Sequence, residues 1–158
     1  MGAGLVRIQQ VKVPVSDLQR SVTWYRSLLG LDLMREFIEE GEPTGAVLVD
    51  REAGFLIGLR RRDAVSGSPR FPGFDLFTMG LSSVEALDEL AAHCDDVGIE
   101  HGELLDRGPD GTQLDIPDPD GTVIRFLSPL GDDGPAFAGV ELSAAGQMTF
   151  YSTPRLSI

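Results

Sequence analysis

The sequence has little of what several common classes of protein require. It contains one cysteine, Cys94, so no disulfide can close within the chain. Its two histidines, His93 and His101, limit any zinc site or Ser/His/Asp triad to these side chains. No apolar run approaches the roughly 18 residues of a membrane-spanning helix, and no segment has the layout of a signal peptide. We therefore expect a cytoplasmic protein with a reduced thiol and no membrane partner.

Positive charge is also scarce. The chain has 13 Lys and Arg residues against 25 Asp and Glu residues, a formal net charge of −12. A phosphate backbone or an anionic membrane surface requires a basic partner, so we expect no nucleic-acid partner. The length of 158 residues and the hydrophobic share of 42% fit one globular domain with a single core.

What is present is a pattern that occurs twice. Each copy has an alternating strand, a capped helix that a glycine ends, and three further strands. The first copy comprises a strand at 11–15, a helix at 16–30 and strands at 31–37, 45–49 and 55–59. The second comprises a strand at 76–81, a helix at 82–98 and strands at 100–105, 112–116 and 122–127. The order βαβββ therefore repeats, and it predicts an α+β fold of two tandem modules.

We interpret residues 1–158 as one domain made of two modules, 7–62 and 74–129. Residues 63–73 are the expected connector, and residues 130–158 form an extension outside both copies. The extension contains four spaced apolar residues that predict either a hairpin or an arm covering a partner subunit: Val140, Leu142, Phe150 and Tyr151.

Two segments carry a resemblance to a known family. Val13 to Leu31 begins VPVSDL, and Ile116 to Phe126 reads IPDPDGTVIRF. With the repeat, these segments resemble the vicinal oxygen chelate (VOC) superfamily, which includes glyoxalase I, extradiol dioxygenases, methylmalonyl-CoA epimerase, fosfomycin-resistance enzymes and bleomycin-resistance binding proteins. The resemblance implies that the modules form a cupped mixed sheet, with the helices outside and a ligand cavity inside. It also implies a homodimer.

Metal-dependent members of this superfamily hold a divalent ion with His and Glu residues on the first and last strands of the modules. The resemblance matches these positions to Gln10, Leu76, Ile57 and Arg125. Only Gln10 offers a neutral oxygen, whereas Arg125 is a fixed cation without a lone pair to donate. We therefore predict that the cup holds no metal and no other cofactor.

Strand alternation places one set of side chains on the inner surface of the expected cup, Leu59 among them. Lys12 and Arg125 are its cations, and they suit an anionic or carbonyl-bearing ligand. Alternatively, Arg125 forms an internal ion pair with Asp115, if the turn at 118–121 sets that register. The predicted ligand-binding residues are Gln10, Lys12, Ile57, Leu76, Thr78, Gln113, Asp115 and Arg125.

Three functional hypotheses follow. The first is a metal-independent VOC protein that binds and sequesters an aromatic or antibiotic-like small molecule. The second is a VOC enzyme, an isomerase, lyase or dioxygenase-like protein, that acts by proton transfer at His101 or Asp115 or with a metal not recognised here. The third is a partner or regulatory subunit without a ligand. The acidic surface favours a cationic guest, whereas Lys12 and Arg125 inside the cup oppose one.

Overall fold

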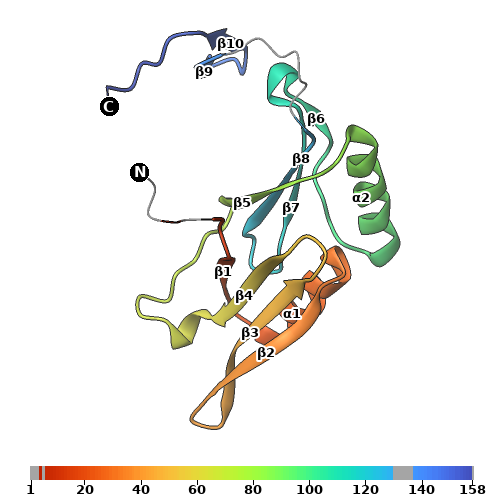
Figure 1. Cartoon of the computed structure of the whole chain (residues 1–158), viewed down its shortest axis with the longest axis vertical. Helices are drawn as coiled ribbons and strands as arrows, with labels where there is room; N and C mark the ends of the chain where they lie inside the picture. The colour runs from red at the N-terminus through yellow and green to blue at the C-terminus, as the bar shows by residue number, and fades with distance from the viewer. Residues whose placement is uncertain (1–3, 5, 130–136, 158) are drawn as a thin grey trace.

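The structure is a computed structural model that describes residue 4, residues 6–129 and residues 137–157. It contains two four-stranded sheets, two longer helices and a C-terminal hairpin (Figure 1). Within these residues, no helix has the length and apolar character needed to cross a membrane.

The first module contains one helix and one sheet. Its elements are β1 (Gln10–Val15), α1 (Leu18–Leu29), β2 (Asp32–Glu39), β3 (Glu42–Asp50) and β4 (Phe55–Arg61). The strand order is β1-β4-β3-β2, and β1 runs parallel to β4. Helix α1 begins after Asp17, whose side chain accepts a hydrogen bond from the Arg20 N–H, and it ends at Gly30 in the left-handed region.

The second module repeats this arrangement. Its elements are β5 (Asp75–Gly80), α2 (Val84–Val97), β6 (Leu105–Asp106), β7 (Thr112–Pro117) and β8 (Val123–Leu127), with short 3-10 helices at Arg62–Ala64 and Gly108–Asp110. The order β5-β8-β7-β6, with β5 parallel to β8, matches the first sheet strand for strand. The predicted α+β fold of two βαβββ modules is confirmed.

One predicted strand is wrong. Residues 100–104 are not part of a strand, and β6 begins only at Leu105. The Gly102 N–H donates to the Asp115 carbonyl at 2.8 Å, and a Cβ on Gly102 would lie 3.1 Å from that oxygen. The chain therefore touches β7 closely at one glycine instead of pairing along its length.

A single core lies between the sheets and the helices. Val13, Leu59 and Leu87 are buried in it together with side chains of both modules. Because β1 and β4 are parallel with Val13 beside Leu59 and Val11 beside Ile57, these residues share one face. Ile57 and Leu59 are 1% and 2% exposed within this core. Their side chains therefore pack in the core and not openly in the cup as predicted, although Leu59 and Ile57 each also border a cavity.

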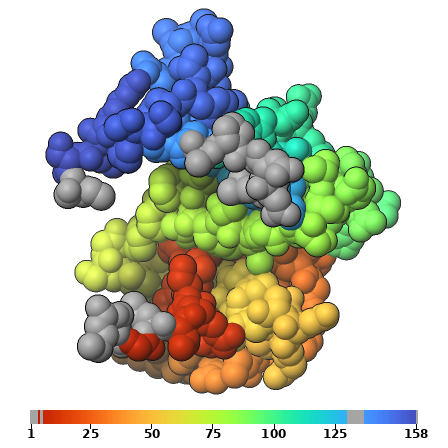
Figure 2. All heavy atoms as spheres, turned by 45° about the horizontal axis from the view of Figure 1, so that its top comes forward, coloured from red at the N-terminus to blue at the C-terminus, as the bar shows by residue number. Residues whose placement is uncertain are grey.

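The C-terminal hairpin is separate from both sheets. It pairs β9 (Gly139–Leu142) with β10 (Met148–Tyr151), and Val140 lies opposite Phe150. Figure 2 shows this segment, in blue, at one end of the molecule. The predicted hairpin is confirmed, and its role as an arm over a partner subunit stays a prediction.

A turn of the second module, Asp118–Gly121, contacts the first module. Buried Asp118 accepts at Oδ1 from the N–H groups of Asp120 and Thr122, both at 2.9 Å, and at Oδ2 from the Tyr25 hydroxyl of α1 at 3.0 Å. Asp120 accepts from the Ser16 N–H at 2.9 Å and pairs with Arg62 at 3.4 Å. Burial raises the pKa of Tyr25, and Asp118 raises it further, so the phenol stays protonated and donates.

We predict that Tyr25→Phe lowers the free energy of unfolding by about 1.5–3 kcal/mol, because it leaves a buried carboxylate oxygen without its donor. Urea denaturation followed by circular dichroism measures this change. Tyr151→Phe is the control, because the Tyr151 hydroxyl has no hydrogen-bond partner among the described residues. A loss below about 0.5 kcal/mol for Tyr25→Phe, the range of ordinary surface substitutions, contradicts the assignment.

Asp118 also predicts a pH dependence. Burial raises the pKa of Asp118 above its ordinary value of 3.8. The folded protein then holds the proton more tightly than the unfolded chain, so the contribution of Asp118 to stability falls as the pH rises from 3.8 to the folded pKa. The free energy of unfolding of the unsubstituted protein minus that of Asp118→Asn should therefore decrease across this window.

Asp63→Asn gives the opposite sign and serves as the control. A hydrogen bond from Arg61 lowers the pKa of Asp63, so its contribution is present above the ordinary carboxylate pKa and is lost as the pH falls. Urea titrations at several pH values measure both differences. Equal slopes for the two variants would refute the assignment.

Candidate ligand-binding site

The concave face of the first sheet is the face opposite the core. The strand register arranges it in three transverse rows. These rows are Gln10–Leu56–Val49, then Lys12–Gly58–Val47–Arg35, and then Pro14–Arg60–Gly45–Phe37. In the first two rows, apolar and glycine positions occupy the central strands β4 and β3, and Gln10, Lys12 and Arg35 stand on the edge strands. The third row differs, because Arg60 stands on the central strand β4.

Gly58 makes room for two side chains of β1. A Cβ at Gly58 would lie 2.3 Å from Nε2 of Gln10 and 3.4 Å from Cγ of Lys12. The Gln10 amide and the stem of Lys12 therefore lie over the glycine, close to the sheet. In a strand, a glycine at such a position commonly marks a close approach of this kind.

A cavity of about 460 Å³ opens on this face. We call it the first-module cavity. Half of its lining is apolar and comes from β2, β3 and β4: Phe37, Ile38, Ala46, Val47, Leu56 and Leu59. The remaining lining residues are Gln10, Lys12, Arg35, Glu39, Gly58 and Arg60. Its size lies in the range of small-molecule sites.

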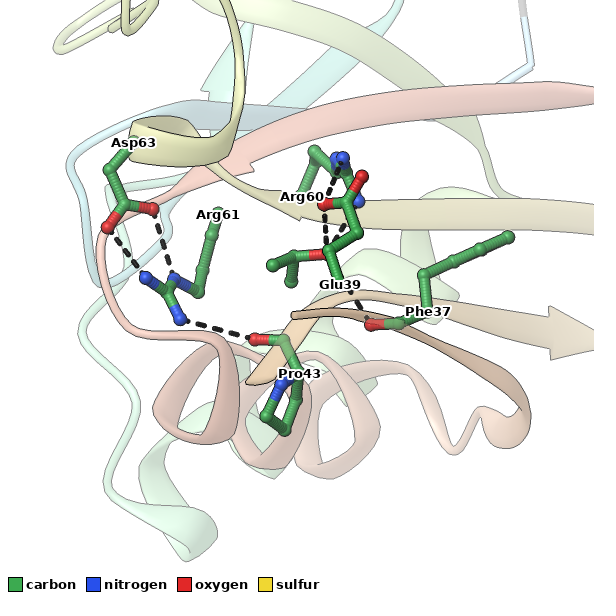
Figure 3. A network of polar contacts seen from close by, with 7 residues as sticks. Phe37, Glu39, Pro43, Arg60, Arg61 and Asp63 are labelled. Carbon is green, nitrogen blue, oxygen red and sulfur yellow. Dashed lines mark hydrogen bonds and ion pairs between the residues drawn. The ribbon is translucent and has the colours of Figure 1, made fainter. Parts of the chain in front are cut away.

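Arg60 and Glu39 form a fixed ion pair at one edge of this cavity (Figure 3). The Arg60 guanidinium donates to Glu39 at 2.6 Å and to the Thr44 hydroxyl at 2.8 Å. The hydrogen bond from Arg60 lowers the pKa of Glu39, so this carboxylate stays ionised at neutral pH. Figure 3 also shows the neighbouring Arg61 directed elsewhere, towards Asp63 and the Pro43 carbonyl.

The equivalent face of the second sheet carries a compensated polar cluster. Arg125 donates to both oxygens of Asp115, each at 2.9 Å, and contacts Asp75 at 2.5 Å. Gln113 donates to Asp115 at 3.4 Å and accepts from Arg107 at 3.3 Å. The predicted register, with Asp115 opposite Arg125, is confirmed, and so is the ion pair. Hydrogen bonding to Asp115 raises the pKa of Arg125 further, so its charge is permanent.

A second cavity of about 560 Å³ lies between the modules, where β1 and β4 approach β5. Four predicted ligand residues line it: Gln10, Ile57, Leu76 and Thr78. Gln10 and Leu56 border both cavities. The structure thus divides the eight predicted residues into three neighbouring groups, since Lys12 lines the first-module cavity and Gln113, Asp115 and Arg125 belong to the second sheet.

Neither histidine lines these two cavities. Nε2 of His93 contacts the Ser27 carbonyl at 2.8 Å, between α2 and α1. Nδ1 of His101 contacts the Gly102 carbonyl at 2.7 Å, and its Nε2 lies 3.4 Å from Asp95. The placement of His101 beside the end of α2 does not suit the proton-transfer role that the sequence left open.

The four positions matched to metal ligands do not fit a metal ion. Gln10 lies over Gly58, Ile57 is in the core, and Arg125 holds two carboxylates in ion pairs. Leu76 has no donor atom on its side chain. Across residues 6–129 and 137–157, no three His, Cys, Asp or Glu side chains are placed to hold a metal ion together. No chemical step through a metal is therefore derived for this chain.

Of the residues that line the first-module cavity, the sequence analysis predicted only Gln10 and Lys12 as ligand-binding, and it missed Arg35, Phe37, Leu56 and Gly58 among others. Gly58 carried a signal, because it interrupts the apolar run at 55–59 within a strand. Arg35 carried none, because β2 has register shifts on both sides of the pairs that place Arg35 and Phe37.

Comparison with known proteins gives fold and family. The sequence profile of the Glyoxalase/Bleomycin resistance protein/Dioxygenase superfamily matches residues 7–126. A domain of this superfamily from Frankia sp. EAN1pec is 24% identical, with a TM-score of 0.67 over 83% of this chain and 96% of that chain. No curated protein matches the chain.

Two further solved structures have the same fold. TnmS3, an antibiotic binding protein from Streptomyces sp. CB03234, is 23% identical, with a TM-score of 0.62 over 81% of this chain and 99% of that chain. Lactoylglutathione lyase from Agrobacterium tumefaciens is 16% identical, with a TM-score of 0.62 over 79% and 95%. The repeated module, the cupped sheets and the profile match together show that this chain belongs to the Glyoxalase/Bleomycin resistance protein/Dioxygenase superfamily.

Proposed function

We propose that this protein binds and sequesters a small organic molecule in the first-module cavity, without a metal ion. The observation that carries the proposal is the lining of this cavity: an apolar floor on β3 and β4, with fixed polar side chains at its edges. A flat apolar ligand buries its surface against such a floor, while hydrogen bonds at the edges orient it.

The chemistry of the lining residues favours binding over catalysis. Glu39 is the only carboxylate among them, and its pair with Arg60 keeps it a weak base. Proton transfer needs a group whose pKa lies near the working pH, and a Lewis acid needs converging donors. The solved relatives include an antibiotic binding protein and a fosfomycin resistance protein from Listeria monocytogenes, which supports an antibiotic-like ligand. The homodimer stays a prediction.

A thermal-shift screen against aromatic metabolites and natural-product antibiotics tests the proposal. We expect at least one compound to raise the melting temperature, because a ligand that binds only the folded state stabilises it. The shift should be the same before and after dialysis against a chelator, and elemental analysis should show no stoichiometric metal. A shift that disappears on chelation would refute metal independence.

Two matched variants locate the bound compound. Leu56→Gln places an amide where the first-module cavity meets the cavity between the modules, whereas Leu33→Gln makes the same change in a depression lined by α1, β2 and β3 on the helix side of the sheet. We expect the shift to be lost in Leu56→Gln and kept in Leu33→Gln. Loss in the second variant alone would move the site away from the concave face.

Gly58→Ala gives a separate prediction. The added methyl group displaces the Gln10 amide from the floor. Because alanine adopts strand dihedral angles without strain, the free energy of unfolding should change by less than about 1 kcal/mol. We expect affinity for the compound to fall about tenfold, the value of one lost hydrogen bond and its packing. Isothermal titration calorimetry measures this.

The double variant Gly58→Ala with Gln10→Ala tests the cause. It should bind as Gln10→Ala alone does, because both changes remove the same contact. Gly80→Ala is the control, since a Cβ there meets nothing within 4 Å and Gly80 lines only the cavity between the modules. Additive losses in the double variant would contradict the role of Gln10.

A further inference from the structure

The first-module cavity carries an excess of positive charge. Its charged lining residues are Lys12, Arg35 and Arg60 against the single carboxylate of Glu39. This excess occurs in a chain whose formal net charge is −12. A local charge opposite in sign to the whole molecule needs a specific explanation.

The partners of these cations separate Arg60 from the other two. Arg60 is neutralised by Glu39 at 2.6 Å. In the part of the chain that the structure describes, neither Lys12 nor Arg35 lies within ion-pair distance of a carboxylate. The one polar contact of the Arg35 guanidinium there is with Sδ of Met34, at 3.9 Å. Two positive charges of the cavity are therefore left uncompensated.

These two cations face each other across the sheet. Lys12 and Arg35 end one row, with Gly58 and Val47 between them. Three strand spacings of about 4.8 Å separate their backbones by roughly 14 Å. The row has no side chain at Gly58, and the Gln10 amide lies over this position. An apolar strip thus has a cation at each end and an amide beside one of them.

In the second sheet, the cation on the inner face is neutralised by carboxylates of the same chain. Arg125 pairs there with both Asp115 and Asp75. Both sheets have the same strand order, so the difference lies in the side chains and not in the topology. The missing carboxylate beside Lys12 and Arg35 leaves a place for one that a ligand brings.

We infer that the ligand is an organic anion, a carboxylate on a flat apolar body. This inference rests on the proposed function and specifies its ligand class. The carboxylate accepts hydrogen bonds from the Lys12 ammonium and the Gln10 amide, and the body lies on Leu56 and Val47. Arg35 supplies the second positive charge. The net charge of −12 belongs to the chain as a whole, whereas Lys12 and Arg35 both line the cavity.

The test uses two ligands of the same shape, anthracene-2-carboxylate and anthracene-2-carboxamide, followed by their own fluorescence anisotropy at low salt. We expect the carboxylate to bind about tenfold more tightly than the neutral amide, from one charge-assisted hydrogen bond and the field of two cations. The preference should shrink as salt is raised.

The variant Lys12→Met with Arg35→Gln should bring the two affinities within about twofold, because the carboxylate loses its charged partners whereas the carboxamide loses only neutral contacts. Arg51→Gln, an exposed arginine on the β3–β4 turn, controls for net charge and should keep the preference. Equal binding of both ligands by the unsubstituted protein overturns the inference and leaves the proposed function standing. Failure of both ligands to bind overturns both.

Discussion

One turn joins the two modules by buried polar contacts, beside the core that they share. Asp118 of the second module reaches the hydroxyl of Tyr25 in the first, and Asp120 beside it reaches Ser16 and Arg62. These contacts join β7 and β8 to the start of α1 and the end of β4. The two sheets are therefore linked by specific hydrogen bonds as well as by apolar packing. The buried carboxylate is costly alone and is kept in place by three donors.

The first-module cavity arises from missing side-chain atoms at defined points. Gly58 removes a Cβ from the centre of the sheet, and side chains from the neighbouring strand fill only part of the space. Gly45, in the next row, is covered by Phe37 and the stem of Arg60, each about 3.3–3.4 Å from where its Cβ would lie. One glycine therefore opens the floor, while the other supports its edge. Of the five polar side chains around the floor, Arg60 and Glu39 pair with each other, and Lys12, Arg35 and Gln10 are outside that pair.

Most of the fold was accessible from the sequence because its signals are local. The polar segments 16–19 and 82–85 and the glycines after both helices mark the helix ends, although the N-caps are Asp17 and Ser83, one residue later than the first residue of each segment. The 118–121 turn sets the register that pairs Asp115 with Arg125. The orientation of Ile57 was not accessible, since β4 is apolar on both faces around it and has no alternation to read. Arg35 was hidden by the register shifts of β2, which change the phase of alternation within one strand.

The duplicated module produces two halves with different tasks. In the second module, charged side chains on the inner face form ion pairs around Arg125, and the 118–121 turn contacts the first module. The first module keeps its inner face open. Lys12, Arg35 and Leu56 take no part in the contacts that join the halves. Side chains on the open face can therefore vary without removing those contacts, so the duplicated fold separates a face that tolerates change from one that stability requires.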